Sequence, residues 1–406
     1  MQIGFGDALL VFGALLAIGA ALSGLMHGTV LSISVFAVGL GIVLAEAGVV
    51  TVEARDPGVV ELIELALILT LFSDGLFVER ELLRVHWGPV TRAIVLAMPL
   101  TLGLLALAAH AIFSALSWEQ AFLLAAVLSP TDPVVTSAVV TSRRVPSLIR
   151  HTLNLESGLN DGLALPFVLF FLVLAGAGGA AGHAAAKLLG EAAFGALVGV
   201  AVGLVGGRLH HHLPGGGITA RYEGIYAVGF GLVAFGLADV TIGNGFIATF
   251  VAGIVMGAAE HEIPDAFVVF AENVSAILQV ITFFAFGALI VATGYGGEVW
   301  RLAAFVLFAL VVARPLAIAL AFLRERLPAA HKAFIAWFGP KGAASMLFAL
   351  FVLRSSVPGH ALIFTIAAYT IVCSIVAHGL TDTVGARWVE RRVAGGLRAG
   401  RAAAPD

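Results

Sequence analysis

Long apolar runs separated by short polar stretches recur from one end of the chain to the other. A run of about 20 apolar residues is enough for a helix to cross the hydrocarbon core of a bilayer. The pattern predicts thirteen such helices, at approximately 7–26, 29–48, 59–78, 92–116, 119–140, 152–175, 184–206, 222–239, 242–258, 267–292, 300–323, 332–353 and 360–380. The predicted fold is therefore that of an all-α polytopic membrane protein.

Two of the predicted spans are interrupted by proline in their interior. Pro130 and Pro133 lie in the fifth span, and Gly-Pro-Lys-Gly occupies 339–342 in the twelfth. Proline removes a backbone donor and clashes with the preceding turn, so we expect both helices to be discontinuous. The breaks lie seven spans apart, and because seven is odd, the two helices should run in opposite directions. Such a pair is typical of inverted repeats around a binding site near the membrane midplane.

Ionisable residues cluster near these breaks, although a charge at membrane depth costs about 2.5–3.5 kcal/mol on insertion scales. Asp132 lies in the first break, and Glu156 and Asp161 lie in the sixth span. Helical spacing puts Ser157 on the same face as Asp161, and Asn160 on the same face as Glu156. The two carboxylates are roughly 140° apart around the helix, so we expect them to have different roles.

Only two Lys or Arg residues lie deep inside the predicted spans rather than at their ends, Arg314 in the eleventh and Lys341 in the twelfth. A buried carboxylate needs a cationic partner to stay charged, so a Glu156–Arg314 pair would hold core helices together. Asp132 and Lys341 would offset helix dipoles at the two breaks. For Lys341 this neutralising role is the favoured interpretation, and for Asp132 contact with substrate is favoured.

Asp161 is the carboxylate that this pairing leaves without a partner. With Ser157 and Asp132 it would supply hard oxygen ligands, which suit protons and alkali cations rather than soft metals. Burial disfavours a charged carboxylate and a bound cation favours it, so proton and cation would compete for the site. Asp74 in the third span is another intramembrane acid, which either lines the ion path or faces water at the cytoplasmic end.

Composition agrees with a membrane protein. Hydrophobic residues make up 60% of the 406 and charged residues 12%, against about 25% charged in soluble domains. The net charge of −3 gives no reason to expect a nucleic-acid partner. The single cysteine, Cys373, excludes an intrachain disulfide. No nucleophile–base set or metal cluster falls in the spans, so we expect neither an enzyme nor a cofactor.

Positive charge is distributed unevenly between the two sides of the predicted membrane. Of the 22 Lys and Arg residues, sixteen follow odd-numbered spans or lie in the C-terminal segment, and four lie on the opposite side. By the positive-inside rule the C-terminus is cytoplasmic and the N-terminus is outside. The predicted location is the cell membrane, with the Arg-rich segment after Gly385 resting on anionic headgroups.

Three polar or glycine-rich segments are predicted to connect the spans. We expect 175–186 to be an Ala/Gly-rich linker and 207–217, with three adjacent histidines at 210–212, to be a flexible loop rather than a metal site. The acidic segment 260–265, which contains His261, is predicted to be either an entrance that concentrates cations or an ordinary turn.

The acidic motifs resemble those of a known transporter family. Thr131-Asp132-Pro133 followed by Glu156-Ser157-x-x-Asn160-Asp161 resembles the signature of the monovalent cation:proton antiporters, sodium/proton exchanger type, in their electroneutral branch. Gly-x-Gly-Phe-x-Ala-x-Phe-x-Ala-Gly at 243–253 and Trp-Phe-Gly-Pro-Lys-Gly-Ala at 337–343 are similar to two further motifs, the second with Lys where many members have Arg. The resemblance runs from about residue 60 to 380.

The resemblance implies a thirteen-helix homodimer in which a core transport domain moves against an interface domain. The interface domain would comprise 1–90 and 177–295, the second part beginning with a linker helix. The core domain would comprise 91–176 and 296–384, and 385–406 would be a cytoplasmic basic tail.

It also implies an ion- and proton-binding site centred on one carboxylate, made of Asp161, Asp132, Ser157, Thr131 and Asp74. The residues implied to support that site are Asn160, Glu156, Arg314 and Lys341. Asparagine at 160, where the electrogenic branch has aspartate, implies electroneutral one-for-one exchange. The expected activity is Na⁺ (or Li⁺)/H⁺ antiport by alternating access. K⁺/H⁺ antiport is the alternative, and a cation channel is a more distant one.

Overall fold

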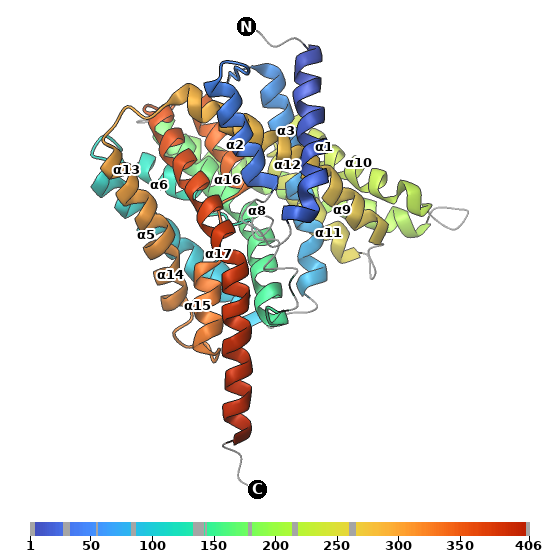
Figure 1. The fold of residues 1–406 in the computed structure, drawn as a ribbon. Helices are drawn as coiled ribbons and strands as arrows, with labels where there is room; N and C mark the ends of the chain where they lie inside the picture. Colours follow the sequence, from blue (N-terminus) through green and yellow to red (C-terminus); the bar gives the residue numbers. More distant parts are fainter. Residues whose placement is uncertain are drawn as a thin grey trace.

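The computed structural model describes residues 5–26, 33–53, 56–82, 87–132, 142, 144–177, 181–212, 218–259 and 265–402. Regular structure within these residues is helical throughout (Figure 1). Six helices are long and apolar enough to cross a membrane: Gly88–Ile112, Ser147–Gly176, Gly182–Leu209, Ala276–Thr293, Val299–Ala321 and His360–Arg392. Shorter apolar helices lie at Leu10–Ala21, Val35–Glu46, Trp118–Val127, Gly245–Ala258 and Ala343–Arg354.

The helices follow the apolar runs of the sequence. The first half contains α1 (Phe5–Met26), α2 (Ile33–Glu46), α3 (Pro57–Leu82), α4 (Trp87–Arg92), the π-helix η1 (Ala93–Ala97), α5 (Met98–Ile112), α6 (Trp118–Val127) and α8 (Ser147–Ala177). The second half contains α9 (Ala181–His212), α10 (Ala220–Asp239), α11 (Gly245–Ala259), α12 (Asp265–Thr293), α13 (Val299–Leu307), the π-helix η4 (Phe308–Ala313), α14 (Arg314–Ala321), α15 (Ala329–Trp337), α16 (Ala343–Arg354) and α17 (His360–Ala402). Each range expected to cross the membrane contains helix.

Two helices stop inside their apolar runs. α6 begins with a capping box, in which Ser117 accepts from the Gln120 amide and the Gln120 side chain accepts from the Ser117 amide. It ends at Val127, three residues before Pro130, and the chain continues without helix to Asp132. In the twelfth predicted span, α15 ends at Trp337 and α16 begins at Ala343. Pro133 lies outside the described residues.

A second pair of irregular helices was not predicted. η1 interrupts the helix of the fourth predicted span and η4 that of the eleventh, which again lie seven spans apart. Pro99 follows η1 and Pro315 follows η4 at the same offset, near the start of α5 and of α14. Proline cannot donate to the carbonyl four residues earlier, so the hydrogen-bond ladder changes its period there.

Small residues let the helices approach one another at backbone distance. On Gly75 of α3, a Cβ would meet backbone atoms of α11, and on Gly199 of α9 it would meet the Ala248 carbonyl of α11. α11 is therefore held tightly between α3 and α9. Close packing of this kind is what stabilises helix pairs in lipid, where the hydrophobic effect between helices is absent.

The structure corrects two predictions about connecting segments. The expected loop at 207–217 is helical as far as His212, and the expected linker at 175–186 is helical in α8 up to Ala177 and in α9 from Ala181. The helical parts of both segments contain no proline, and the second segment is rich in alanine, the strongest helix former. The histidine side chains at 210–212, and the acidic segment at 260–264 with the Asp265 side chain, lie outside what the structure describes.

The C-terminal helix is longer than the span predicted for it. α17 continues through Ala402, and Figure 1 shows its end extending beyond the rest of the helical bundle. The same view places α5, α13 and α14 on one side of the molecule and α9 and α10 on the other, with α8 and α16 between them. Asp132 and Lys341, at the ends of the interrupted helices, are both buried.

Candidate ion-binding site at two broken helices

The two helix breaks are in direct contact. The Asp132 amide donates to the Pro340 carbonyl at 2.8 Å, and the Ala343 amide donates to Asp132 Oδ2 at 3.1 Å. A Cβ on Gly342 would overlap the Asp132 carboxylate, so only glycine fits there without a shift. Asp132 therefore binds the N-terminal end of α16, where unpaired amides and the helix dipole favour a negative charge.

Lys341 makes the complementary contact in the other direction. Its Nζ donates to the carbonyls of Pro130 at 3.1 Å and Ser129 at 3.5 Å, just beyond the end of α6. Carbonyls at a helix C-terminus carry partial negative charge, which an ammonium group offsets. Each break therefore supplies the charge that neutralises a helix end at the other break. The Lys341 side chain is buried, with 4% of its surface exposed.

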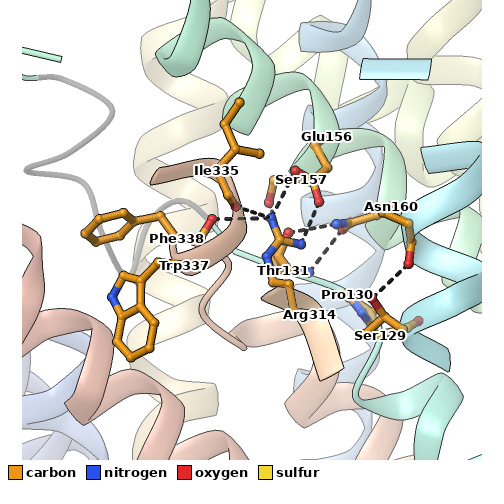
Figure 2. A network of polar contacts seen from close by, with 12 residues as sticks. Ser129, Pro130, Thr131, Glu156, Ser157, Asn160, Arg314, Ile335, Trp337 and Phe338 are labelled. Atoms are coloured by element: carbon orange, nitrogen blue, oxygen red, sulfur yellow. Dashed lines mark hydrogen bonds and ion pairs between the residues drawn. The ribbon is translucent and has the colours of Figure 1, made fainter. Parts of the chain in front are cut away.

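Thr131 is fixed by two side chains of α8 (Figure 2). Asn160 accepts from the Thr131 amide at 3.2 Å, and its Nδ2 donates to the Thr131 hydroxyl at 2.7 Å. The Ser157 hydroxyl donates to the Thr131 carbonyl. The first break is thus held against α8 by Asn160 and Ser157, although helical spacing had put these two residues on different faces.

Glu156 and Arg314 form a buried, bidentate ion pair. Arg314 Nη1 donates to Glu156 Oε1 at 2.7 Å, and Nη2 donates to Oε2 at 3.1 Å. Nη2 also lies 3.3 Å from the carbonyls of Ile335 and Phe338, at the end of α15 (Figure 2). Arg314 therefore connects α14, α8 and the second break.

A histidine and a serine that the sequence analysis did not single out complete the second break. His378 Nε2 lies 2.9 Å from the Trp337 carbonyl, and its Nδ1 lies near the hydroxyl and carbonyl of Ser374. The Lys341 amide donates to the Ser374 hydroxyl at 3.0 Å. Both residues lie on α17, one turn apart. Their only signal in the sequence is this spacing of polar residues within an apolar run.

Asp161 and Asp74 each have a carboxylate oxygen outside this hydrogen-bond network. Asp161 is 6% exposed, and its Oδ1 has no hydrogen-bond partner among the described residues; the same holds for Asp74 Oδ2. Asp74 packs against Gly158, one turn from Asp161 on α8. Asp161 lies within range of electrostatic interaction with Asp74, Asp132 and Lys341. The structure thus brings three carboxylates within electrostatic reach of one another.

The predicted site residues therefore gather at one place in the bundle. Hydrogen bonds or ion pairs connect the two breaks, α8 and α14 through Thr131, Asp132, Ser157, Asn160, Glu156, Arg314 and Lys341. No group of three His, Cys, Asp or Glu side chains suited to a resident metal occurs in the part of the chain that the structure describes.

Comparison with known proteins places the chain in a family. The family described as sodium/hydrogen exchanger, transmembrane, matches residues 11–385. The chain is 28% identical over 360 residues to the K(+)/H(+) antiporter NhaP of Alkalimonas amylolytica, covering 87% of this chain and 62% of that protein. It is 26% identical over 378 residues to Na(+)/H(+) antiporter 2 of Zygosaccharomyces rouxii, covering 81% of this chain and 45% of that protein. The chain thus spans about three fifths of the length of the first relative.

The fold is similar to that of a solved transporter structure. The sodium proton antiporter MjNhaP1 from Methanocaldococcus jannaschii, at pH 8, superposes with a TM-score of 0.77 at 17% identity, covering 94% of this chain and 98% of the other. This likeness confirms the predicted all-α polytopic membrane fold. The family comprises transporters, which confirms the prediction that the chain is not an enzyme. Since the family match extends over residues 11–385, the chain belongs to the sodium/hydrogen exchanger family.

Proposed function

We propose that this chain exchanges a monovalent cation for a proton across the membrane, and that both ions compete for the Asp161 carboxylate. The observation that carries the proposal is the environment of Asp161. Its carboxylate is buried, and its Oδ1 is unpartnered among the described residues. Lys341, the cation that attracts it, also binds the carbonyls beyond α6. A buried carboxylate with a free oxygen gains by binding either a proton or a cation.

Exchange follows from this competition. When Asp161 holds a proton it is neutral and has no charge with which to bind a cation. When it holds a cation, the proton has left. If only these two loaded forms change the side to which the site opens, each turnover moves one cation one way and one proton the other. Asn160 is uncharged, so Asp161 is the only acid of this adjacent pair that can take up or release a proton. A single titrating acid at these two positions supports an electroneutral stoichiometry.

The moving part in this proposal is the core domain that contains both breaks. We propose thirteen membrane crossings related by inverted repeats, with the fifth and twelfth crossing helices building the site. Two independent pairs support this symmetry: the breaks after α6 and α15, and the π-helices η1 and η4, each seven predicted spans apart. Rocking of such a core against an interface domain is how many transporters expose a midplane site alternately. A homodimer, an outside N-terminus and a cytoplasmic C-terminus belong to the same proposal.

Sodium, or lithium, is the cation that we propose first. The named relatives include both a Na(+)/H(+) antiporter and K(+)/H(+) antiporters, so potassium is the second candidate. Selectivity among alkali cations depends on the number and field strength of the ligands around the ion. The carboxylates of Asp161, Asp132 and Asp74 form a strong-field, acidic environment, which favours the smaller ions.

Vesicles reconstituted with the purified chain test the proposal directly. A pH gradient is imposed, and the internal pH is followed after addition of Na⁺, Li⁺ or K⁺, with protein-free vesicles as the control. Cation-dependent proton movement that does not change when a voltage is applied is the expected result. Proton movement with none of the three cations would overturn the proposal. A cation channel would instead give a conductance in planar bilayers without an obligatory proton flux.

A further inference from the structure

Thr70 of α3 has a buried hydroxyl that no described residue binds. Its side chain is 6% exposed, and its Oγ1 has no hydrogen-bond partner in the part of the chain that the structure describes. It lies one helical turn before Asp74, so the two side chains share a face of α3. An unsatisfied hydroxyl inside a membrane protein is destabilising, so its presence calls for an explanation such as a bound ion.

Other buried threonines satisfy their hydroxyls in a different way. Thr101, Thr249, Thr282 and Thr370 each donate to the carbonyl four residues earlier in their own helix, at 2.7–2.9 Å. This bond is open in principle to any threonine in a helix. Thr70 does not make it, so its hydroxyl oxygen remains free for another partner.

The packing of α3 against α8 places Thr70 at the level of Asp161. Asp74 lies against Gly158, and Val78 belongs to the same buried cluster as Leu155. A step of one turn forward on α3 therefore corresponds to one turn backward on α8, which means that the helices are antiparallel. One turn before Asp74, at Thr70, the facing position on α8 is 161–162.

Three unpartnered oxygens therefore belong to residues on adjacent turns of the packed helices α3 and α8. They are Thr70 Oγ1, Asp74 Oδ2 and Asp161 Oδ1. We propose that the Thr70 hydroxyl is a neutral oxygen ligand of the transported cation and sets which alkali cation the site prefers. This inference rests on the proposed function, because it assigns to Thr70 a part of the same site.

A neutral ligand affects the two transported ions differently. A cation that leaves water must regain oxygen contacts, and a hydroxyl replaces one hydration water without adding charge. A proton on Asp161 needs no such ligand. Loss of the Thr70 hydroxyl should therefore weaken cation binding and change the preference among cations, while the proton-coupled turnover at saturating cation stays the same.

The test compares Thr70→Val, which keeps the side-chain shape and removes the hydroxyl, with Thr70→Ser, which restores it. Thr282→Val is the matched control, because the Thr282 hydroxyl is buried but bound to its own helix. The KM and kcat values for Na⁺, Li⁺ and K⁺ are measured by vesicle exchange. For Thr70→Val we expect KM of the preferred cation to rise about tenfold, the effect of losing one good polar contact. Its kcat should stay within about twofold, and the ratio of KM values among the three cations should change.

Thr70→Ser and Thr282→Val should both keep the wild-type KM ratios. Unchanged ratios in Thr70→Val would overturn the inference, as would an equal change in Thr282→Val. Thr70→Ala provides a second removal of the hydroxyl if the valine variant does not fold.

A binding measurement separates this inference from the proposed function. Purified protein in weakly buffered detergent is titrated with NaCl, LiCl or KCl, and the protons released are followed with a pH indicator. Wild-type protein that releases protons on cation binding but does not exchange ions in vesicles would contradict the proposed function alone. In that case a change in the order of the three cations in Thr70→Val supports the role of Thr70, and an unchanged order overturns it. If the wild-type protein binds none of the cations, both proposals fail.

Discussion

Two carboxylates five residues apart on α8 are buried to nearly the same extent but have opposite surroundings. Glu156 is 3% exposed and Asp161 is 6% exposed. Both Glu156 oxygens accept from Arg314, whereas Asp161 Oδ1 accepts from no described residue. The first acid has its charge matched within the protein, and the second has an oxygen that no described residue binds.

Glu156 and Asp161 are therefore expected to have different roles: the first stabilises the site, and the second takes part in the proposed ion exchange. A buried ion pair contributes little net stability, but removal of one partner leaves an uncompensated charge at high cost. Glu156 and Arg314 are therefore committed to fixing α8, α14 and the end of α15 relative to one another. Asp161 is held by the same rigid helix while its own carboxylate stays available. The comparison leads to four mutational predictions, given from the largest expected effect to the smallest.

The largest effect is expected for Asp161→Asn. Asparagine keeps the shape of the side chain but neither titrates nor carries a charge, so exchange of every cation should fall to the level of protein-free vesicles. Thermal unfolding in detergent should show equal or greater stability, because an unpartnered buried charge has been removed. Normal transport by this variant would show that the site lies elsewhere.

Arg314→Met should mainly reduce stability, whereas Asp161→Asn should mainly abolish exchange. Loss of the arginine leaves Glu156 buried without a partner, and we expect a loss of about 3–5 kcal/mol in stability. The double variant Glu156→Met/Arg314→Met should recover most of that loss, since both charges are gone. Chemical unfolding of the wild type, the single variants Glu156→Met and Arg314→Met, and the double variant forms a double-mutant cycle. A cycle with no coupling energy would contradict the structural role of the pair.

Gly342→Ala tests the contact between the two breaks. The added methyl group would overlap the Asp132 carboxylate, so the α16 end must move away from the first break. Overpacking of this kind costs about 1–3 kcal/mol, and exchange should be strongly reduced because the site is built at that contact. Gly103→Ala is a suitable control, because a methyl group there meets nothing within 4 Å. Equal exchange by both variants would show that the crossing tolerates displacement.

His378→Leu is expected to have the smallest effect. It removes the imidazole beside the Trp337 carbonyl and leaves that carbonyl without its partner, at a cost of about 1–2 kcal/mol. Asp161 is not touched, so the order of preference among cations should stay as in the wild type. A thermal shift assay and vesicle exchange measure the two quantities. A changed cation preference would show that α17 belongs to the ion site itself.

Much of this arrangement could be predicted from residue types and spacing. Apolar runs of spanning length predicted the helices, and proline inside two of them predicted the positions of the breaks. Scarcity of intramembrane cations left few partners for Glu156, which is why its contact with Arg314 could be predicted. The ion-binding roles of Asp161 and Asp74 remain predictions.

Other features could not be obtained from the sequence for physical reasons. The hydrogen bonds of Thr131 join positions 26 and 29 residues apart, and helical faces alone wrongly separated Ser157 from Asn160. The roles of Ser374 and His378 depend on how α17 crosses the break, which tertiary packing determines. The helical stretches near His212 and Ala181 were missed because glycine and polar residues suggested loops, while neighbouring helices and alanine content favoured helix.

The dependence of cation affinity on pH tests the central claim most directly. In vesicle exchange, the KM of the preferred cation is measured at a series of pH values for the wild type. If cation and proton compete for one carboxylate, KM rises as pH falls, approaching about tenfold per pH unit in the acid range, while the maximal rate at saturating cation changes little. A KM that stays constant across that range while the maximal rate falls would contradict competition at Asp161.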